Sequence, residues 1–335
     1  MRVLTITNMY PDGKRSFFGS FVRDRVEALR RLGVEMDVWI SDAALDGKSA
    51  YIRHLPSLWR LLRRERFDVL HCEHTWSMLQ LAAVRPRKAP PSVFTIHEAE
   101  ALYQGGSQEA EGLLRRLVYQ KGLKLRALRA ADRVVCVNRN LAPAVGFHGP
   151  FEVIQPGVDL DRFRPIEQAE ARSRLNLDQH AAIAFFPATP SRRLQKGTPL
   201  YEEARQLLGP KVEWLVGGDI PFDDMPLYIN AADVIVQTSR FEASPMVAKE
   251  ALACNRPLVS TDVGDVRELF GQTPGVFLTT QDARDVAAKI ELALAEGADG
   301  LDGRARVIEL GLGLDDVAAR YLELYEELIR ERRAA

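Results

Sequence analysis

Glu242 and Glu250 lie in the run FEASPMVAKEALACNRPLVSTDVG, residues 241–264, at a spacing that could serve chemistry. The run predicts a loop, a helix, a turn and a strand in that order, with Glu242 ahead of the helix and Glu250 two turns inside it. The two carboxylates therefore need not be a paired acid and base. A carboxylate beside the backbone N–H groups of residues 244–247 can hold a sugar hydroxyl together with a phosphate. That combination suits a nucleotide sugar, whereas a solvated glutamate on a surface helix is the alternative for the pair taken alone.

Local signals mark both ends of this helix. Ser244 is the expected N-cap and Pro245 the first helical residue. The helix is expected to reach about Cys254, where Asn255 stops it in the left-handed conformation. The candidate residues of this stretch for binding a nucleotide sugar as donor are Glu242, Ala243, Ser244, Pro245, Met246, Val247 and Glu250.

A second group of chemical interest is basic. The run PATPSRRLQKG places Arg192, Arg193 and Lys196 in one loop that ends at Gly197. Like charges are costly to crowd together unless an anion joins them, and phosphate is the obvious anion. A solvated charged turn is the alternative if the loop stood alone. Further along, paired glycines end a strand and allow close backbone approach, which adds Gly217 to the donor-binding candidates.

In the first half, candidate residues follow the expected strands. The loop PDGKRSFFGS, residues 11–20, carries Gly19 at a helix entry, where a phosphate or sugar could approach the backbone. The chain has no GxGxxG at this point, which argues against a dinucleotide site. His97 follows another strand, and a structural histidine and a functional one are about equally favoured there.

The tetrapeptide HCEH, residues 71–74, offers two histidines and a glutamate that could suggest a metal site. Alternate residues at a strand end are expected to point to opposite faces, so these side chains would not meet on one ion. We therefore expect no metal. The D-x-D of Asp159 and Asp161 lies in an apparent interdomain linker, where we interpret it as coincidence.

The elements that must position these residues form two alternating series. Buried strands are expected at residues 2–7, 34–40, 68–72, 92–96 and 133–137, and again at 182–186, 212–216, 234–237, 257–260 and 275–278. In the first half, amphipathic helices are expected at residues 18–32, 51–66 and 112–130, and a long one closes the chain at 314–332. This pattern predicts two doubly wound parallel sheets, whose ligands collect beyond the carboxyl ends of the strands.

Composition bounds the remaining possibilities. A chain of 335 residues with 46% hydrophobic and 27% charged residues predicts a soluble protein of two domains. Residues 1–155 hold 24 Lys and Arg against 16 Asp and Glu, while the remainder holds 21 against 30. Three cysteines form no disulfide framework or metal spacing, and no long apolar segment or leader is evident, so we expect a cytoplasmic protein.

Two of the expected helices are basic, and this raises the question of whether the protein contacts a membrane. Residues 51–66 and 112–130 each combine several Lys or Arg with leucines. Either helix could lie on an anionic membrane surface, at the inner face of the cell membrane. A solvated face whose leucines pack on the sheet is about twice as favoured for each alone. Nucleic acid is not expected as a partner, because no aromatic platform or recognised fold motif accompanies the charge.

Taken together, these runs resemble the family-4 retaining glycosyltransferases of the GT-B fold. The resemblance rests on the two Rossmann-like halves, the linker IQPGVDLDRF, the basic turn ending QKG and the run EASPMVAKEALACNRPLVSTDVGDVRE. The opening NMYP and the segment FFGSFVRDRVEAL resemble members that build bacterial cell-surface polysaccharides. The resemblance implies an acceptor-binding domain at residues 1–155, joined by residues 318–335 of a C-terminal helix that crosses back, and a nucleotide-sugar-binding domain at residues 156–317. It also implies a cleft between the two.

The resemblance further implies roles for individual residues. Glu242 would lie beside the donor sugar and Glu250 would bond the ribose hydroxyls. Lys196 would hold the diphosphate. The family's usual arginine falls at Ser191 in this chain, so Arg192 is the nearest substitute for it. His97 would lie near the transferred sugar, although Glu98 replaces the usual following glycine and alters the cavity. Asn255 replaces another of the family's usual glycines, and its expected role as a helix stop tolerates this replacement.

We therefore expect a retaining hexosyl- or N-acetylhexosaminyl-transferase that needs no metal or other cofactor. The expected donor is a UDP-sugar, with a GDP-sugar as second candidate, and the expected acceptor is a glycan, a lipid-linked sugar or a small glycoside. The rival hypotheses are a nucleotide-sugar 2-epimerase of the same fold, for which the extra acid and base residues are not evident, and a non-catalytic partner protein. Retention of Glu242, Lys196 and Glu250 argues against the latter.

Overall fold

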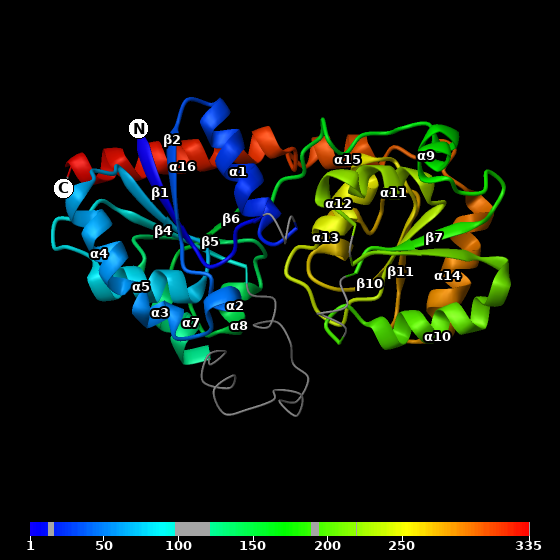
Figure 1. The fold of residues 1–335 in the computed structure, drawn as a ribbon, viewed down its shortest axis with the longest axis horizontal. Coiled ribbons are helices and arrows are strands. Elements are labelled where there is room, and N and C mark those ends of the chain that lie inside the picture. The colour runs from blue at the N-terminus through cyan, green and yellow to red at the C-terminus, as the bar shows by residue number, and fades with distance from the viewer. Residues whose placement is uncertain (13–16, 98–120, 189–193, 219, 335) are drawn as a thin grey trace. The chain divides into compact units, whose positions relative to one another are not determined.

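The computed structural model describes residues 1–12, 17–97, 121–188, 194–218 and 220–334 (Figure 1). The chain divides into two compact units, one of Met1–Gly157 with Leu314–Ala335 and the other of Val158–Gly313. The first unit therefore extends to Gly157, and it includes the whole C-terminal helix. Each unit is built on one parallel sheet, which is the fold class that the alternating pattern predicted.

The first sheet has six strands in the order β2-β1-β3-β4-β5-β6, and all of its pairs are parallel. Its strands are β1 (Arg2–Thr7), β2 (Glu35–Ile40), β3 (Val69–Cys72), β4 (Ser92–Ile96), β5 (Arg133–Cys136) and β6 (Glu152–Val153). The described helices of this unit are α1 (Ser20–Arg31), α2 (Ala43–Asp46), α3 (Ala50–Arg53), α4 (Leu55–Arg64), α5 (Thr75–Val84), α7 (Lys121–Ala130), α8 (Leu141–Ala144) and α16 (Leu314–Ala334). Burial on both faces explains why the central strands are apolar runs rather than alternating ones.

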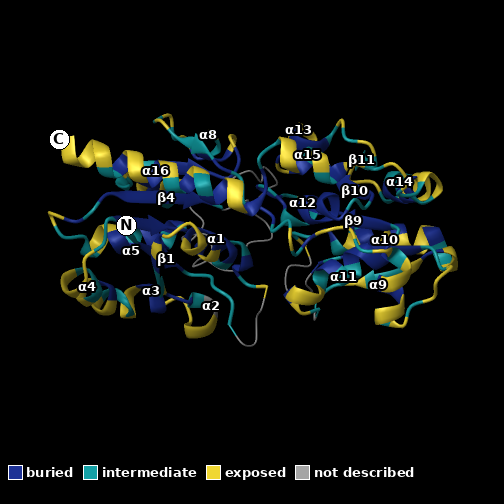
Figure 2. Ribbon diagram, turned by 90° about the horizontal axis from the view of Figure 1, so that it is seen from above, coloured by how far each residue is buried: buried dark blue, intermediate teal, exposed yellow. Residues whose placement is uncertain are grey.

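The C-terminal helix α16 packs on the first sheet beside α1. Its buried stripe includes Val317, Tyr321, Leu324 and Leu328, which join Val3 of β1 and residues of other strands in one hydrophobic cluster. These positions recur at helical spacing, so one face of the helix is buried while the other stays exposed (Figure 2). The expected return of the chain end to the first domain is thus present within this unit.

The helix expected at residues 51–66 is divided into α3 and α4. The division falls at His54, two residues before Pro56, which occupies the first turn of α4 and has no N–H to donate to the carbonyl of Ile52 in α3. Leu58 is fully buried, whereas Ile52 and Trp59 are exposed. The part of the second basic helix at residues 112–120 lies outside the described residues.

The second sheet has five parallel strands in the order β11-β10-β9-β7-β8. These are β7 (Ile183–Phe186), β8 (Glu213–Val216), β9 (Val234–Gln237), β10 (Leu258–Thr261) and β11 (Val276–Thr279). The described helices of this unit are α9 (Gln168–Leu175), α10 (Thr198–Leu208), α11 (Met225–Ala231), α12 (Met246–Ala253), α13 (Val266–Phe270), α14 (Ala283–Glu296) and α15 (Gly303–Glu309), with short 3₁₀ turns at Gly209–Lys211 and Phe222–Asp224. One hydrophobic cluster lies between the sheet and α10 with α14, and another includes α11, α12 and α15.

Candidate functional site

A lysine and a glutamate from different loops meet in the second unit. Lys196 lies between β7 and α10, and Glu242 lies between β9 and α12. The Lys196 Nζ is 2.6 Å from the Glu242 Oε1, and the same oxygen accepts a hydrogen bond of 2.9 Å from the Ser239 hydroxyl. Glu242 is buried, while the side chain of Lys196 keeps 29% of its exposure. Two sequence-predicted site residues therefore form one charge pair that remains accessible from the lysine side.

The backbone around Lys196 is fixed by Gly197. This glycine has a φ of +66°, and a Cβ placed on it would lie 1.8 Å from the carbonyl oxygen of Thr238. The Thr238 hydroxyl donates to the carbonyl oxygens of Lys196 and Gly197, at 3.1 and 3.0 Å. Only glycine permits this close approach, so the lysine loop is held against the end of β9.

The helix that follows Glu242 differs slightly from its prediction. Helix α12 begins at Met246, and its N-cap is Pro245 rather than Ser244. The Ser244 hydroxyl instead accepts a 2.8 Å hydrogen bond from Lys249. Since proline has no N–H, the backbone donors expected at residues 244–247 are interrupted at Pro245. The predicted stop is confirmed, because Asn255 has a φ of +52°.

Lys249 is a buried residue of this site that the sequence interpretation missed. It has no exposed surface, and burial lowers its pKa to about 8 although Asp265 and Glu250 oppose that shift. Glu250, the next residue along α12, is 5% exposed. The available signal was a lysine within an otherwise apolar, alanine-rich helix, where a charged side chain must find polar company.

A third loop joins the other two. Gly264, after β10, has a φ of +62°, and a Cβ on it would lie 2.7 Å from the carbonyl oxygen of Ala243. The Thr261 hydroxyl donates to the Ser239 carbonyl oxygen at 2.6 Å, which also ties β10 to the loop that carries Glu242. Loops after β7, β9 and β10 therefore converge at the carboxyl edge of the sheet, where parallel α/β sheets collect ligands.

Gly217 and Gly19, the two other glycines predicted to contact the donor, each pack closely against the backbone of another segment of the chain. A Cβ on Gly217 would lie 2.9 Å from the Cα of Pro187. A Cβ on Gly19, whose φ is +75°, would lie 2.6 Å from the backbone carbonyl of Met9. Both positions require glycine for the packing of the chain on itself, and their contact with a donor stays a prediction.

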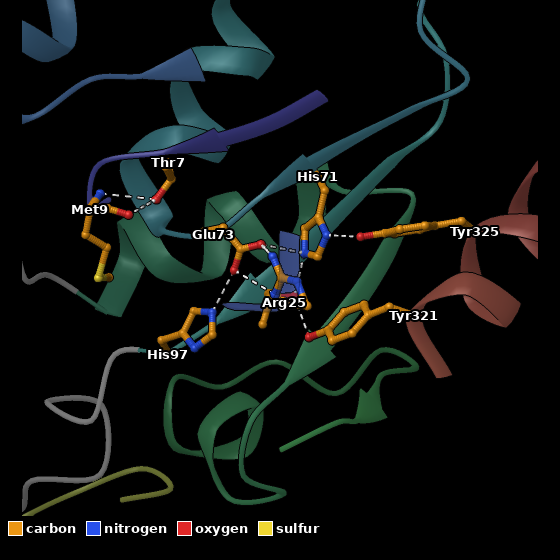
Figure 3. A network of polar contacts seen from close by, with 9 residues as sticks. Thr7, Met9, Arg25, His71, Glu73, His97, Tyr321 and Tyr325 are labelled. Carbon is orange, nitrogen blue, oxygen red and sulfur yellow. Dashed lines mark hydrogen bonds and ion pairs between the residues drawn. The ribbon is translucent and has the colours of Figure 1, made fainter. Parts of the chain in front are cut away.

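In the first unit, His97 lies directly after β4 and contacts a buried carboxylate (Figure 3). The His97 Nε2 is 2.8 Å from the Glu73 Oε2, and Arg25 of α1 forms an ion pair with the same carboxylate. Burial alone would raise the pKa of Glu73, but Arg25, His71 and His97 hold it below its usual range. Glu73 is therefore an anion that bridges His97 and Arg25.

The expectation that the side chains of His71 and Glu73 point to opposite faces is wrong. Because the two are two residues apart, they lie on the same face, and the His71 Nε2 is 3.1 Å from the Glu73 Oε1. The pKa of His71 is lowered to about 3 by burial, so its ring is neutral. His74 serves another purpose, since its ring accepts the backbone N–H of Trp76 and caps α5.

The remaining sequence-predicted residues are placed as follows. Arg192, Arg193 and Glu98 lie outside the described residues. Asp159 accepts backbone hydrogen bonds of 3.0 Å from Asp161 and Arg162, so its carboxylate shapes a turn in the linker.

Comparisons with known proteins match both halves of the chain. Residues 19–162 match the family model described as Glycosyltransferase Family 4, and residues 191–296 match the one described as Glycosyl transferases group 1. D-inositol 3-phosphate glycosyltransferase of Mycobacterium sp. (strain JLS) is 30% identical over an alignment 272 residues long, and the match covers 69% of this chain and 60% of that protein. The match therefore spans less than two thirds of this relative.

Two solved structures have the same fold. Sucrose-phosphate synthase from Thermosynechococcus elongatus superposes with a TM-score of 0.80 at 20% identity, covering 98% of this chain and 99% of the other. Anabaena HepE in complex with UDP-glucose superposes with a TM-score of 0.72 at 14% identity, covering 98% of this chain and 100% of the other. At these identities the likeness concerns the arrangement of the elements.

Proposed function

We propose that this chain, which belongs to the family-4 glycosyltransferases with the GT-B fold, moves a hexosyl or N-acetylhexosaminyl group from a nucleotide-diphosphate sugar to an acceptor, with retention of anomeric configuration. The observation that carries the proposal is the Lys196–Glu242 pair directly ahead of α12, with Glu250 inside that helix. The second unit would bind the donor and the first the acceptor. A glycan, a lipid-linked sugar or a small glycoside would be the acceptor.

The proposed chemistry follows from where charge develops. As the bond between the anomeric carbon and the phosphate oxygen breaks, the sugar becomes oxocarbenium-like and the diphosphate gains negative charge. The Lys196 ammonium and backbone N–H groups at the start of α12 would stabilise that charge. The bond from the acceptor oxygen to the anomeric carbon forms on the same face, and the acceptor proton passes to the departing phosphate oxygen. In this scheme no metal takes part in the step.

The donor is proposed to be a UDP-sugar. HepE, which has the same fold, was crystallised with UDP-glucose, and this supports a uridine nucleotide over the GDP-sugar that stays the second candidate. Within the second unit, Glu250 would bond the ribose hydroxyls, because a carboxylate can accept from two vicinal hydroxyl groups. In the first unit, His97 would lie near the transferred sugar.

Donor cleavage tests the reaction class. The full chain would be incubated with UDP-, GDP- and ADP-sugars, with and without acceptors, and release of nucleotide diphosphate would be followed together with the sugar product. Acceptor-dependent release with a new α-linked product from an α-linked donor supports the proposal. A rearranged free sugar without acceptor would favour a 2-epimerase, and absence of any turnover across donors and acceptors would favour a non-catalytic partner.

We also propose that α3 and α4 contact an anionic membrane surface on the cytoplasmic side. Ile52 and Trp59 are 73% and 42% exposed, and the Arg63 guanidinium lies 4.4 Å from the centre of the Trp59 ring. Exposed apolar side chains among arginines are typical of a helix at a lipid interface. No helix within the described part of the chain is long and apolar enough to cross a membrane.

Cosedimentation with vesicles tests this contact. Binding should require phosphatidylglycerol, fade as salt rises, and weaken in the variant Ile52→Ser/Trp59→Ser. Leu45→Ser is the matched control, because Leu45 is also exposed but lies on α2. Equal binding to neutral vesicles would contradict the electrostatic part of the proposal.

A further inference from the structure

A polar cavity of about 810 Å³ lies at the amino edge of the second sheet. Its walls come from α9 and the loop ahead of it, from Asp233 directly before β9, from Asn255 and Arg256 between α12 and β10, and from the turn after α14. Lys196 and Glu242 follow strands β7 and β9, so they lie at the opposite, carboxyl edge. The cavity is therefore separate from the site proposed for the donor.

Arg256 brings to this cavity a guanidinium that the chain leaves largely unsatisfied. Its side chain makes one hydrogen bond and no ion pair among the described residues, and in that bond Nη2 donates to the Ile166 carbonyl oxygen at 3.2 Å. The Nε atom is buried and has no acceptor in the described part of the chain. Burial lowers the pKa of Arg256, and the charges of Asp233 and Glu167 only partly oppose that shift. Because arginine stays protonated in proteins, a partly buried charge with several N–H donors here meets a single acceptor.

Two further side chains add donors to the same cavity. Arg164 is exposed, and its guanidinium has no hydrogen bond or ion pair among the residues that the structure describes. The Asn255 Oδ1 is already occupied, because it accepts the backbone N–H of Arg304 at 2.8 Å. The amide nitrogen of Asn255 is then the polar atom that this side chain has left, and it can only donate. Together these donors suit an oxyanion with several acceptor atoms, as in phosphate.

The carboxylates that line the cavity are of two kinds. Asp233 and Glu170 already pair with arginines of α9, at 2.8 and 3.7 Å. Glu167 and Asp299 are exposed and pair with no cation of the described chain. An ionised carboxylate accepts hydrogen bonds from hydroxyl groups. The cavity therefore combines cationic donors with exposed acceptors.

We propose that this cavity binds a phosphate monoester that also carries hydroxyl groups, such as a phosphorylated sugar. Arg256, Arg164 and the Asn255 amide hold the phosphate, while Glu167 and Asp299 accept from the hydroxyl groups. A guanidinium presents its donors in a fork that matches phosphate oxygens, so the bound phosphate supplies the acceptors that Arg256 lacks. The inference goes beyond the proposed function, because the cavity lies at the other edge of the sheet and its ligand is not the donor.

Calorimetric titration of the full chain with inorganic phosphate and with glucose 6-phosphate tests the site. The wild-type chain should bind both probes at millimolar concentration or below. Glucose 6-phosphate should bind about threefold or more tightly than inorganic phosphate, since its hydroxyl groups reach further acceptors. Absence of binding for both probes would overturn the proposal.

Substitutions of the two arginines test the phosphate contacts. Arg256→Met keeps an unbranched side chain but removes the guanidinium, and it should weaken the binding of both probes about tenfold or more. Arg164→Met should also weaken both, and because Arg164 is exposed it serves as the test if Arg256→Met does not fold. Arg205→Met, on an exposed position of α10 outside the cavity, is the matched control and should bind as wild type does. Unchanged affinity in either folded variant would overturn the assigned contacts.

The hydroxyl part of the proposal has its own test. Asp299→Ala should narrow the preference for glucose 6-phosphate over inorganic phosphate, because it removes an acceptor that inorganic phosphate does not use. Asp299 is exposed, so the substitution should leave the fold intact. An unchanged preference would overturn the assignment of Asp299 to a hydroxyl group.

Phosphate binding at the proposed donor site must be distinguished from binding in the cavity. Lys196→Ala removes the cation assigned to the leaving diphosphate, yet it should retain the binding of glucose 6-phosphate in the cavity. Loss of that binding in Lys196→Ala with its retention in Arg256→Met would place the ligand at the carboxyl edge and overturn the inference. If the chain transfers no sugar, the proposed function fails, while these titrations still decide whether the cavity binds a phosphate monoester.

Discussion

Replacing Lys196 by alanine is expected to slow sugar transfer about a hundredfold, mainly through kcat. The lysine is the described cation that contacts Glu242, at 2.6 Å, and we assign it to the leaving diphosphate. Its effect should be larger in the transition state than in the bound substrate, because negative charge grows on the phosphate as the sugar departs. The binding of the free nucleotide diphosphate should weaken less than the rate of transfer falls.

The magnitude follows from the exposure of the side chain. Two unit charges about 4 Å apart interact by about 4 kcal/mol at an effective dielectric constant of about 20, which applies near a protein surface. Lys196 keeps 29% of its side-chain exposure, so solvent and salt screen part of this interaction. A remainder of about 3 kcal/mol corresponds to roughly a hundredfold in rate.

Replacing Lys196 also removes the ion-pair partner of Glu242, and this effect must be separated from the loss of the cation at the leaving phosphate. Without Lys196, Glu242 keeps the Ser239 hydroxyl but loses its counterion, and the carboxylate would then repel the leaving phosphate. In the double variant Lys196→Ala/Glu242→Gln this repulsion is absent. A double-mutant cycle on kcat therefore measures how much of the loss comes from the unpaired carboxylate.

The assay is the initial rate of nucleotide diphosphate release at saturating acceptor, measured with varied donor. Lys211→Ala, in the exposed turn after α10, is the matched control and should leave kcat unchanged. Turnover of Lys196→Ala within about threefold of wild type would refute the assignment of this lysine to the leaving group.

Three further substitutions test other parts of the second unit. Glu250→Ala should weaken binding of free nucleotide diphosphate, measured by calorimetry, by about tenfold and more than it lowers kcat; unchanged affinity would contradict the ribose assignment. Gly264→Ala should lower the free energy of unfolding by about 1–3 kcal/mol or more, because its Cβ would lie 2.7 Å from Ala243 O, while Gly300→Ala, at a similar φ of +75° with nothing within 4 Å, should cost less in the same thermal melts. Lys249→Met should remove a pH dependence: since burial lowers the pKa of Lys249 from 10.5 to about 8, the unfolded chain binds the extra proton between these values, and wild-type stability relative to the variant should rise with pH there, approaching tenfold in the unfolding constant per pH unit. A flat difference between the two unfolding curves over that window would contradict the last expectation.

The strands of both sheets could be predicted from the sequence because each is marked by a local pattern of apolar residues. A buried parallel strand is a short apolar run, and the strands expected at residues 2–7, 92–96 and 234–237 have those bounds in the structure. Helix ends were less accessible. The start of α12 was predicted one residue early at Pro245, because the choice between Ser244 and Pro245 as N-cap depends on Lys249, whose ammonium engages the Ser244 hydroxyl.

The candidate site was accessible only in part, since its geometry comes from contacts distant in sequence. Lys196 and Glu242 were both singled out, but their direct pairing depends on Gly197 packing against Thr238, and no local pattern states how closely two loops approach. For Gly19 and Gly217, the sequence predicted contact with a ligand but not the contacts that they make within the chain. A glycine at a strand end or helix entry is compatible with ligand approach, yet here each also meets another segment of its own chain.

The HCEH tetrapeptide shows why a polar cluster cannot be assigned from spacing alone. His71 and Glu73 share a face, as ligands of one ion would, but the cation they meet is the guanidinium of Arg25, which arrives from α1. Arg25 also lies 4.6 Å from the Tyr321 ring of α16, so the cluster is completed by a helix some 250 residues further along the chain. Together with His71 and His97, this guanidinium holds the pKa of the buried Glu73 below its usual range, so the carboxylate stays ionised where burial alone would favour its neutral form.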